Sequence, residues 1–169
     1  MRKFLSIVIL GLLSFLLTSS DTGYIPEVHK KYIANHLHLA VKYQHECGVP
    51  ASITLAQALV ESGGGYSELG KNAHNHFGIK AFSNWKGKTY KGFRAYDNIE
   101  EGYADHALFL YEHYSQAVGK PASYWTTYCK GYGGPGYWAH IAKVVKSYDL
   151  TVYDNTSPHP YEWQWVNSK

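Results

Sequence analysis

The chain has 169 residues and a formal net charge of +3 at pH 7, and its composition stands out for 16 Tyr, 5 Trp and 6 Phe. Arg2 and Lys3 supply most of that charge and lie in a leading segment that we expect to be removed, so the remaining chain is nearly neutral and no nucleic-acid partner is expected. About 150 remaining residues suit one domain with its own core, and amphipathic rings in such numbers can cover surface or stack on sugars.

The first predicted element is a secretory signal peptide over residues 1–20. A basic start is followed by an apolar stretch over residues 4–17 and then by small polar residues. This stretch falls short of the ~20 residues that a membrane-spanning helix needs, so a membrane anchor is the weaker interpretation. No cysteine near the expected cleavage point offers a lipid attachment site. We therefore expect a secreted or periplasmic protein with no stable membrane span after signal cleavage.

Two helices are predicted next. Residues 27–46 carry apolar side chains at helical spacing, and Gly48 should end this helix. Pro50 should open a second helix over residues 51–62, because the first turn of a helix needs no backbone donor there. The second helix is apolar on more than one face, so we expect it to be the buried central helix.

The middle of the chain predicts a small β element. Residues 75–96 contain short strand-like pieces around glycines, which we interpret as a hairpin or a three-stranded flap. Asn98 and Glu101 have the spacing of a capping box, so the next helix should begin there. Two further helices are expected at about 122–129 and 137–148.

These elements predict a mainly helical α+β fold. We assign one domain to residues 21–155 and leave the aromatic tail, residues 156–169, without a role. The two cysteines, Cys47 and Cys129, would enter an oxidising compartment after export, so a disulfide and a pair of buried thiols are both open. Two cysteines cannot complete a zinc site, and we expect neither a metal nor another cofactor.

The stretch ALVESGGGYSELG, residues 58–70, contains the strongest catalytic candidate, Glu61. Burial and the negative end of the helix dipole both disfavour the ionised carboxylate and should raise its pKa. A carboxylic acid that keeps its proton near neutral pH can donate it to a leaving group, as the general acid does in glycoside hydrolysis. The glycines at 63–65 should end the helix and leave open backbone, so that a bulky polymer can approach.

Three ordered blocks place this carboxylate in a wider pattern. They are AQALVES (56–62), NHFGIK (75–80) and FRAYDNIEEGYADHALFL (93–110). In order and spacing the chain resembles the bacterial peptidoglycan N-acetylglucosaminidases of glycoside hydrolase family 73, which include autolysins and the hydrolase domain of a flagellar rod protein. A weaker likeness continues through residues 131–150, so the resemblance covers nearly all of the mature chain.

The resemblance implies a lysozyme-like fold, in which a helical lobe and a small β-hairpin flap flank a glycan groove. It implies cleavage of peptidoglycan glycan strands at the β-1,4 bond between N-acetylglucosamine and N-acetylmuramic acid, with Glu61 as general acid. The family's groove tyrosine falls on Trp138 or, with a shift of one residue, on Tyr137. The positions expected to bind substrate are Asn75, Phe77, Tyr96, Tyr132 and Trp138.

The second catalytic group stays open. Glycosidases with two carboxylates keep them roughly 5 to 9.5 Å apart, and some family members carry the second one in the flap hairpin, but residues 85–96 contain no acid. Glu101 is a candidate, although the capping box offers it a structural role. The other acids near this helix start, Asp97, Glu100 and Asp105, have similar roles open to them. The alternatives are a water held by polar groups such as Tyr137 and attack by the substrate's own N-acetyl group.

Two further positions depart from the family pattern. Gly64 stands where the family usually has a tryptophan, so a ring near the acid is missing. The rings considered as replacements are Trp85, Tyr90 and Trp138. His74 and His76 replace an asparagine and a leucine, and a His-x-His pair without a third ligand is better explained by polar packing than by a metal site.

The sequence therefore supports one leading function and two alternatives. The leading one is an exported peptidoglycan glucosaminidase that acts as a monomer. The first alternative is a non-catalytic peptidoglycan-binding domain of lysozyme-like fold, suggested by the missing tryptophan and the acid-free flap. The second is a muramidase or a lytic transglycosylase, which would use the same acid and the same groove on a different bond or with a different product.

Overall fold

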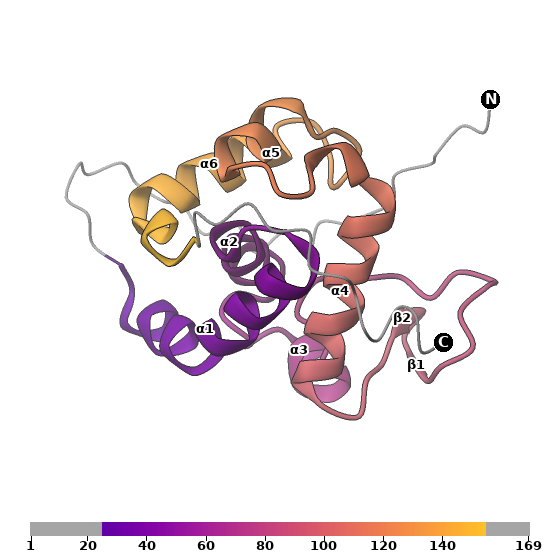
Figure 1. The fold of residues 1–169 in the computed structure, drawn as a ribbon. Coiled ribbons are helices and arrows are strands. Elements are labelled where there is room, and N and C mark those ends of the chain that lie inside the picture. The colour runs from indigo at the N-terminus through magenta and orange to yellow at the C-terminus, as the bar shows by residue number, and fades with distance from the viewer. Residues whose placement is uncertain (1–24, 155–169) are drawn as a thin grey trace.

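The computed structural model describes residues 25–154, so the predicted signal peptide (1–20) and tail (156–169) lie outside the described residues. Helices dominate this part of the chain, with one two-stranded antiparallel sheet. Figure 1 shows α2 (Ala51–Ser62) near the middle, with α1 (Glu27–Cys47), α4 (Ile99–His113) and α6 (Tyr137–Ser147) around it. The predicted mainly helical α+β class is confirmed.

The junction between α1 and α2 follows the predicted signals with one correction. Gly48 is the C-cap of α1 in the left-handed conformation, and its N–H donates to the carbonyl of Gln44. Pro50 precedes α2 as its N-cap and does not occupy the first turn. The side-chain oxygen of Gln44 accepts from the N–H of Ala51 at 2.6 Å, so α1 supplies a partner for a helix N–H that would otherwise be unpaired.

A short helix that the sequence analysis missed follows α2. It is α3 (Glu68–Ala73), and the hydroxyl of its N-cap Ser67 accepts from the N–H of Gly70 at 3.0 Å. Six residues with a glycine inside give too little periodicity to indicate a helix from sequence. The cap therefore identifies this helix better than its pattern does.

The flap consists of residues 80–96. Of the two forms predicted for it, a hairpin and a three-stranded flap, the structure contains the hairpin. β1 (Thr89–Tyr90) pairs with β2 (Phe93–Arg94), and a single bridge joins Lys80 to Phe93. Figure 1 shows the hairpin at the edge of the molecule, away from α5 and α6.

The helices after the flap lie close to their expected positions. The side chain of Asn98 accepts from Glu101 N at 2.9 Å, which confirms the predicted cap of α4, while the Glu101 side chain accepts from the N–H of Asp97, one residue before the cap, at 3.0 Å. The remaining elements are η1 (Ser115–Ala117), α5 (Ala122–Tyr128), α6 and η2 (Leu150–Tyr153).

The core surrounds α2 on several sides. This helix packs against α1, α5, α6 and η2, and residues 51–59 are all buried. Ile53 and Leu55 are fully buried, and burial of such a side chain contributes ~2 kcal/mol. The predicted central helix is confirmed. The Glu61 carboxyl group near its end therefore belongs to the most firmly packed element of the domain.

The two cysteines are free thiols in this structure. Cys47 and Cys129 are both buried, and Cys47 Sγ donates to the carbonyl of Tyr43 at 2.6 Å. Burial raises the pKa of Cys47 to about 12 and that of Cys129 to about 11. Of the two interpretations left open by the sequence, the structure contains the buried thiols.

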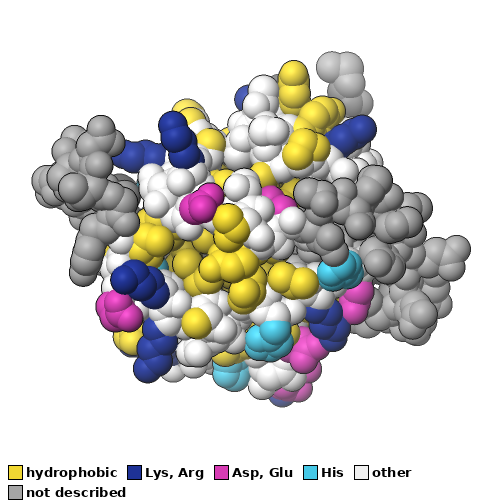
Figure 2. Space-filling view, turned by 60° about the vertical axis from the view of Figure 1, so that its left-hand side comes forward, with side chains coloured by type: hydrophobic (Ala, Val, Ile, Leu, Met, Phe, Trp, Pro, Cys, Tyr) yellow, Lys and Arg dark blue, Asp and Glu magenta, His cyan; other side chains and the backbone are white. Residues whose placement is uncertain are grey.

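The surface carries hydrophobic as well as charged groups. Figure 2 shows hydrophobic side chains gathered in the middle of one face, with charged side chains around them. Large hydrophobic residues exposed in the described part are Tyr66, Phe82, Tyr111, Tyr128 and Val152. Between residues 25 and 154, every helix is too short or too polar to cross a membrane.

Candidate active site

Glu61 lies in the last turn of α2, with its side chain partly exposed. Gly63 ends the helix in the left-handed conformation. The hydroxyl of Ser62 donates to a carbonyl one turn earlier at 2.6 Å and accepts from Gly65 N at 2.7 Å. These bonds hold the turn that follows the acid, so the local backbone sets the direction of the Glu61 side chain.

The glycines after Glu61 serve close packing more than open access. A Cβ added to Gly64 would lie 3.3 Å from Cδ2 of His29, and one added to Gly65 would lie 3.2 Å from the ring of Tyr32. Both contacts are with α1. Only Gly63 would meet no heavy atom within 4 Å, so the open backbone predicted for all three glycines is correct for that one residue.

The ring that the family pattern places at residue 64 has no direct substitute. The space beside Gly64 is taken by α1, and each candidate ring contacts other groups. Trp85 packs against the guanidinium of Arg94 at 4.6 Å, Tyr90 donates to Glu68 at 2.8 Å, and Trp138 packs among Tyr114, Trp125 and Tyr132. The packing role of the missing ring therefore passes to α1.

The electrostatic environment of Glu61 matches the expectation for a general acid. Burial raises its pKa to about 7, and a hydrogen bond from Tyr137 acts in the opposite direction. Burial and the neighbouring Glu61 charge in turn raise the pKa of Tyr137 well above its ordinary value, so the phenol keeps its proton. A carboxyl group with a pKa near 7 is protonated in much of the population at neutral pH and can donate that proton.

The loop of residues 75–79 borders one side of the carboxyl group. The Asn75 amide donates to the carbonyls of Ile79 and Arg94, both at 2.9 Å, and its oxygen accepts from the N–H groups of Phe77 and Ile79. These bonds hold Gly78 at φ +64°, where a Cβ would lie 3.4 Å from Oε2 of Glu61. Gly78 thus leaves room beside the acid that no other residue type would leave.

Tyr137, and not Trp138, faces the acid. Tyr137 is the first residue of α6, and its hydroxyl accepts from Nε2 of Gln57 at 3.2 Å and is hydrogen-bonded to Glu61. Its ring lies so close to Gly133 that a Cβ there would come within 2.3 Å of it. Of the two adjacent rings, Tyr137 is therefore the one that contacts Glu61, and its catalytic role stays a prediction.

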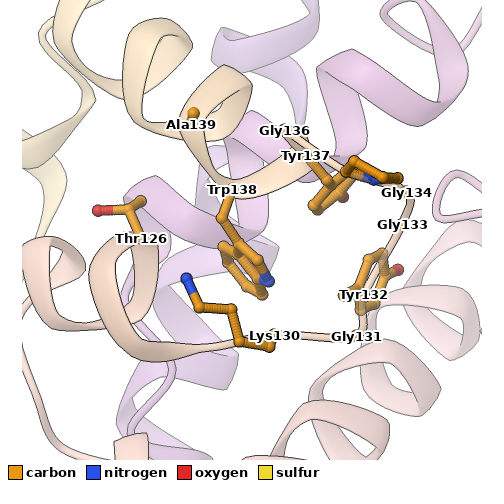
Figure 3. Close-up of a pocket in the computed structure, with 11 residues that line it drawn as sticks. Thr126, Lys130, Gly131, Tyr132, Gly133, Gly134, Gly136, Tyr137, Trp138 and Ala139 are labelled. Carbon is orange, nitrogen blue, oxygen red and sulfur yellow. The ribbon is translucent and has the colours of Figure 1, made fainter.

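A pocket of about 560 Å³ adjoins this tyrosine. Figure 3 shows Tyr132 and Tyr137 on one side of it and Trp138 and Lys130 on the other, with the glycine-rich turn at residues 133–136 along its edge. Aromatic faces and backbone groups together form a lining suited to a sugar-containing ligand.

The residues predicted to bind substrate are all largely buried. Asn75, Phe77, Tyr96, Tyr132 and Trp138 are exposed by 1, 0, 7, 4 and 6%. Tyr132 donates to the carbonyl of Phe77 at 3.1 Å, and Tyr96 donates to Asp105 at 2.6 Å. Tyr132 and Trp138 are nevertheless part of the pocket lining, and the substrate-binding role of all five residues stays a prediction.

The acids considered for a second catalytic role all have structural partners. Glu101 accepts a backbone hydrogen bond beside the α4 cap, Glu100 pairs with Lys42, and Asp97 pairs with Lys88. Asp105 accepts from Arg94 at 2.8 Å on both oxygens as well as from Tyr96. The sequence analysis did not consider Glu68 of α3, which accepts from Tyr90 at 2.8 Å and from Lys91 at 2.6 Å.

His74 and His76 are polar packing residues, as expected. His74 Nδ1 lies 3.0 Å from the carbonyl oxygen of Tyr96, and His76 Nδ1 lies 2.6 Å from the hydroxyl of Tyr32. Burial lowers the pKa of His76 to about 4. In the described part of the chain, no three His, Cys, Asp or Glu side chains gather in a way that could hold a metal ion.

Two buried residues near the acid were missed by the sequence analysis as functional groups. Gln57 and His106 are fully buried, and His106 Nε2 lies 3.2 Å from Oε1 of Gln57. Gln57 precedes Glu61 by four residues, so both lie on one face of α2, and that spacing was the available signal. His106 comes 49 residues later in the chain than Gln57, and its place in the motif block of residues 93–110 was the available signal.

The chain is similar in sequence to known peptidoglycan-degrading proteins. The exo-glucosaminidase LytG of Bacillus subtilis (strain 168) is 32% identical over an alignment of 148 positions, which covers 72% of this chain and 51% of that protein. The peptidoglycan hydrolase FlgJ of Pseudomonas aeruginosa is 29% identical over an alignment of 158 positions, which covers 76% of this chain and 40% of that protein. The chain thus spans about half or less of the length of these relatives.

Solved structures support the same fold. A peptidoglycan hydrolase from Sphingomonas sp. A1 aligns with a TM-score of 0.61 and 28% identity over 79% of this chain and 99% of that chain. The catalytic domain of the autolysin Auto from Listeria monocytogenes aligns with a TM-score of 0.57 and 23% identity over 79% of this chain and 92% of that chain, a likeness in fold alone. The predicted lysozyme-like fold is confirmed.

The family model named Glucosaminidase and described as mannosyl-glycoprotein endo-beta-N-acetylglucosaminidase matches residues 37–150. That range contains the end of α2 with Glu61, the loop with Gly78 and the start of α6 with Tyr137. The match includes well over half of the chain, so the protein belongs to the glucosaminidase family of glycoside hydrolases.

Proposed function

We propose that this protein is an exported peptidoglycan hydrolase that cleaves the β-1,4 bond between N-acetylglucosamine and N-acetylmuramic acid, with Glu61 as general acid. The observation that carries the proposal is the pKa of Glu61, which burial raises to about 7 at a partly exposed position beside Gly78. The names of the relatives in Bacillus subtilis and Pseudomonas aeruginosa support peptidoglycan as the substrate. Export rests on the signal peptide predicted at residues 1–20, and the enzyme is proposed to act as a monomer.

In this mechanism Glu61 protonates the glycosidic oxygen as the bond to the sugar breaks. The transition state then resembles an oxocarbenium ion, which the leaving-group proton helps to form. Tyr137 holds the carboxyl group by its hydrogen bond. Because Gly78 presents no side chain to Glu61, the scissile oxygen can approach the acid from that side.

The nucleophile is proposed to be the N-acetyl group of the substrate. Glu68, Asp97, Glu100, Glu101 and Asp105 already bind structural partners. Tyr137 already accepts from Gln57 and is hydrogen-bonded to Glu61, so its hydroxyl is poorly placed to hold an attacking water as well. Attack by the substrate's carbonyl oxygen needs no protein nucleophile and is a recognised exception to the two-carboxylate scheme.

The first test is mass spectrometry of borohydride-reduced fragments after purified peptidoglycan is incubated with the mature protein or with Glu61→Gln. We expect reduced N-acetylglucosamine ends that disappear in the variant. Reduced muramic ends would identify a muramidase instead, and anhydro-muramic ends a lytic transglycosylase. If neither protein creates new ends although both bind peptidoglycan, the non-catalytic binding domain becomes the better interpretation. Long fragments would indicate internal cleavage, and release of terminal sugars would indicate exo cleavage.

The second test distinguishes the nucleophiles. Attack by the N-acetyl group followed by hydrolysis retains the anomeric configuration, whereas direct attack by water inverts it. Proton NMR of a soluble glycan fragment immediately after cleavage should therefore show the β-anomer first. Initial formation of the α-anomer would contradict the substrate-assisted step and leave the assignment of Glu61 as acid intact.

A further inference from the structure

Gln57 and His106 lie behind the acid, fully buried, with no access to a polymeric substrate. We infer that they are positioning residues, which set the direction of a hydrogen-bond chain from His106 through Gln57 and Tyr137 to Glu61. This inference rests on the proposed function for its catalytic meaning, while the chain itself is a property of the fold.

The chain has three links. His106 Nε2 lies 3.2 Å from Oε1 of Gln57, and Nε2 of Gln57 donates to the Tyr137 hydroxyl, also at 3.2 Å. The third link is the side-chain interaction of the Tyr137 hydroxyl with Glu61, which lowers the pKa of the carboxyl group. The links join α4, α2 and α6, so three helices hold the position of one carboxyl group.

The chemistry of each group then determines where the hydrogens are. An amide oxygen only accepts, so Nε2 of His106 must carry the proton that lies between it and Gln57. The Gln57 amide nitrogen only donates, so the Tyr137 oxygen accepts from it. Tyr137 has a single hydrogen, and that hydrogen remains available for Glu61.

His106 is suited to impose this direction. Burial lowers its pKa to about 3, so the ring is neutral and has one N–H. Phe77 stacks on it at 3.7 Å with an interplanar angle of 8°, which holds the ring plane. Nδ1 has no hydrogen-bond partner among residues 25–154. A proton on Nδ1 would leave a buried donor unpaired and would bring two acceptors together at Gln57.

The direction of the chain matters for proton transfer. When Tyr137 donates to one oxygen of the neutral carboxyl group, the acidic proton sits on the other oxygen and can move to the glycosidic oxygen. If the chain ran the opposite way, the Tyr137 hydrogen would point to Gln57 and its lone pair would face Glu61. The acidic proton would then be donated to Tyr137 and not to the substrate.

The decisive experiment compares pH profiles of kcat/KM for Tyr137→Phe, Gln57→Met and the double variant. Loss of the Tyr137 hydrogen bond should raise the pKa of Glu61. The alkaline limb of the profile should therefore move to higher pH by about half a pH unit, and kcat/KM should fall ~10-fold. Gln57→Met should give a smaller shift in the same direction, because Tyr137 becomes a weaker donor. When Tyr137→Phe is already present, Gln57→Met should change neither the position of the alkaline limb nor kcat/KM any further.

The outcomes separate positioning from simple stabilisation. Equal effects of Gln57→Met with and without Tyr137 would overturn the inference. Gln44→Met is the matched control, because Gln44 is a buried glutamine whose oxygen caps α2 outside this chain of bonds. It should lower the melting temperature and leave the pH profile unchanged.

Two NMR measurements on the wild-type fold keep the inference testable without enzymatic turnover. Nitrogen-15 shifts should show His106 neutral with its proton on Nε2 between pH 5 and 8, and carbon-13 titration of Glu61 should show a higher pKa in Gln57→Met than in wild type. A proton on Nδ1 would overturn the inference. If the NMR results are as expected but no glycan is cleaved, the proposed function fails and the hydrogen-bond chain stands.

Discussion

The two sides of the site are held by different kinds of interaction. On the helical side, Glu61, Gln57 and Tyr137 lie on packed helices and are joined by buried hydrogen bonds. On the flap side, Lys91 pairs with Glu68 and Lys88 pairs with Asp97, and all four side chains are more than half exposed. Buried polar bonds are costly to break, whereas exposed ion pairs contribute little and are screened by salt. The structure thus combines a rigid acid with a flap of low local stability.

One ion pair of the flap is mostly buried, like the hydrogen bonds on the helical side. Arg94 and Asp105 join β2 to α4 with side chains that are each only 15% exposed. Tyr96 adds a third bond to the same carboxylate. The flap is therefore held by one mostly buried ion pair at Arg94 and by exposed ion pairs at Lys88 and Lys91.

The largest effect is expected for Glu61→Gln. Loss of the proton donor should reduce cleavage at least ~10³-fold. The stability of the folded protein should instead increase in the variant at high pH. Because the folded state raises the carboxyl pKa to about 7, it binds the proton more tightly than the unfolded state does, so wild-type stability falls as pH rises from ~4.5 to ~7. The variant should thus be more stable by ~2 kcal/mol at pH 8 and by almost nothing at pH 4.

Urea unfolding at the two pH values measures this difference. A stability gain of equal size at pH 4 and pH 8 would show that the Glu61 carboxyl group is not the source of the pH dependence.

Gly78→Ala should give the next largest effect. Its Cβ would lie 3.4 Å from the Glu61 carboxyl group, on the side from which substrate must approach, and its φ of +64° strains any other residue. We expect a 10- to 100-fold loss of kcat/KM, roughly 1.4–2.7 kcal/mol in the barrier, together with ~1 kcal/mol of destabilisation.

Gly92→Ala is the matched control for this substitution. Gly92 lies in the hairpin turn at φ +82°, and its Cβ would meet no heavy atom within 4 Å among the described residues. It should lose similar stability and keep its activity. Equal losses of activity in the two variants would show that backbone strain, and not the space beside Glu61, limits cleavage.

The helical side was largely predictable because its signals are local. The apolar run of α2 and its C-terminal glycine lie within a few residues of Glu61, and together they indicate burial, helix end and raised pKa. α3 was missed because six residues carry too little pattern. The choice between Tyr137 and Trp138 depends on how α6 meets α2, which no local pattern contains.

For residues in the motif blocks, the sequence indicated that they belong to the site but not what each side chain does there. Asn75 and Phe77 belong to a motif block, but the block does not say which way their side chains point. Both are buried, one shaping the loop and the other stacking on His106. The partnership of Gln57 with His106 joins distant parts of the sequence, so only the folded chain reveals it.

In the mostly buried ion pair, Asp105→Asn should cost about 2 kcal/mol of stability. The substitution leaves the Arg94 cation mostly buried without its counter-charge, and this costs more than the net value of the ion pair. Asp97→Asn makes the same change in an exposed pair with Lys88 and should leave the midpoint of unfolding unchanged. Equal shifts in thermal unfolding would contradict the contrast between the mostly buried and the exposed ion pair.

The smallest effect is expected for Glu68→Gln in α3, whose carboxyl group pairs with Lys91 in the hairpin turn. The Lys91 ammonium lowers the pKa of this fully exposed carboxyl group, so its contribution is present at neutral pH and is lost as pH falls through the folded-state value, below ~4.5. In the variant, the midpoint of global unfolding should hardly change. At low salt, amide exchange in β1 and β2 should be faster in the variant than in wild type. Because salt already screens the wild-type pair, the difference should disappear at ~1 M salt. Exchange in α2 should be the same in both proteins at either salt concentration, since its protection depends on buried contacts; a salt-dependent change there would show that the flap and the acid-bearing helix open together.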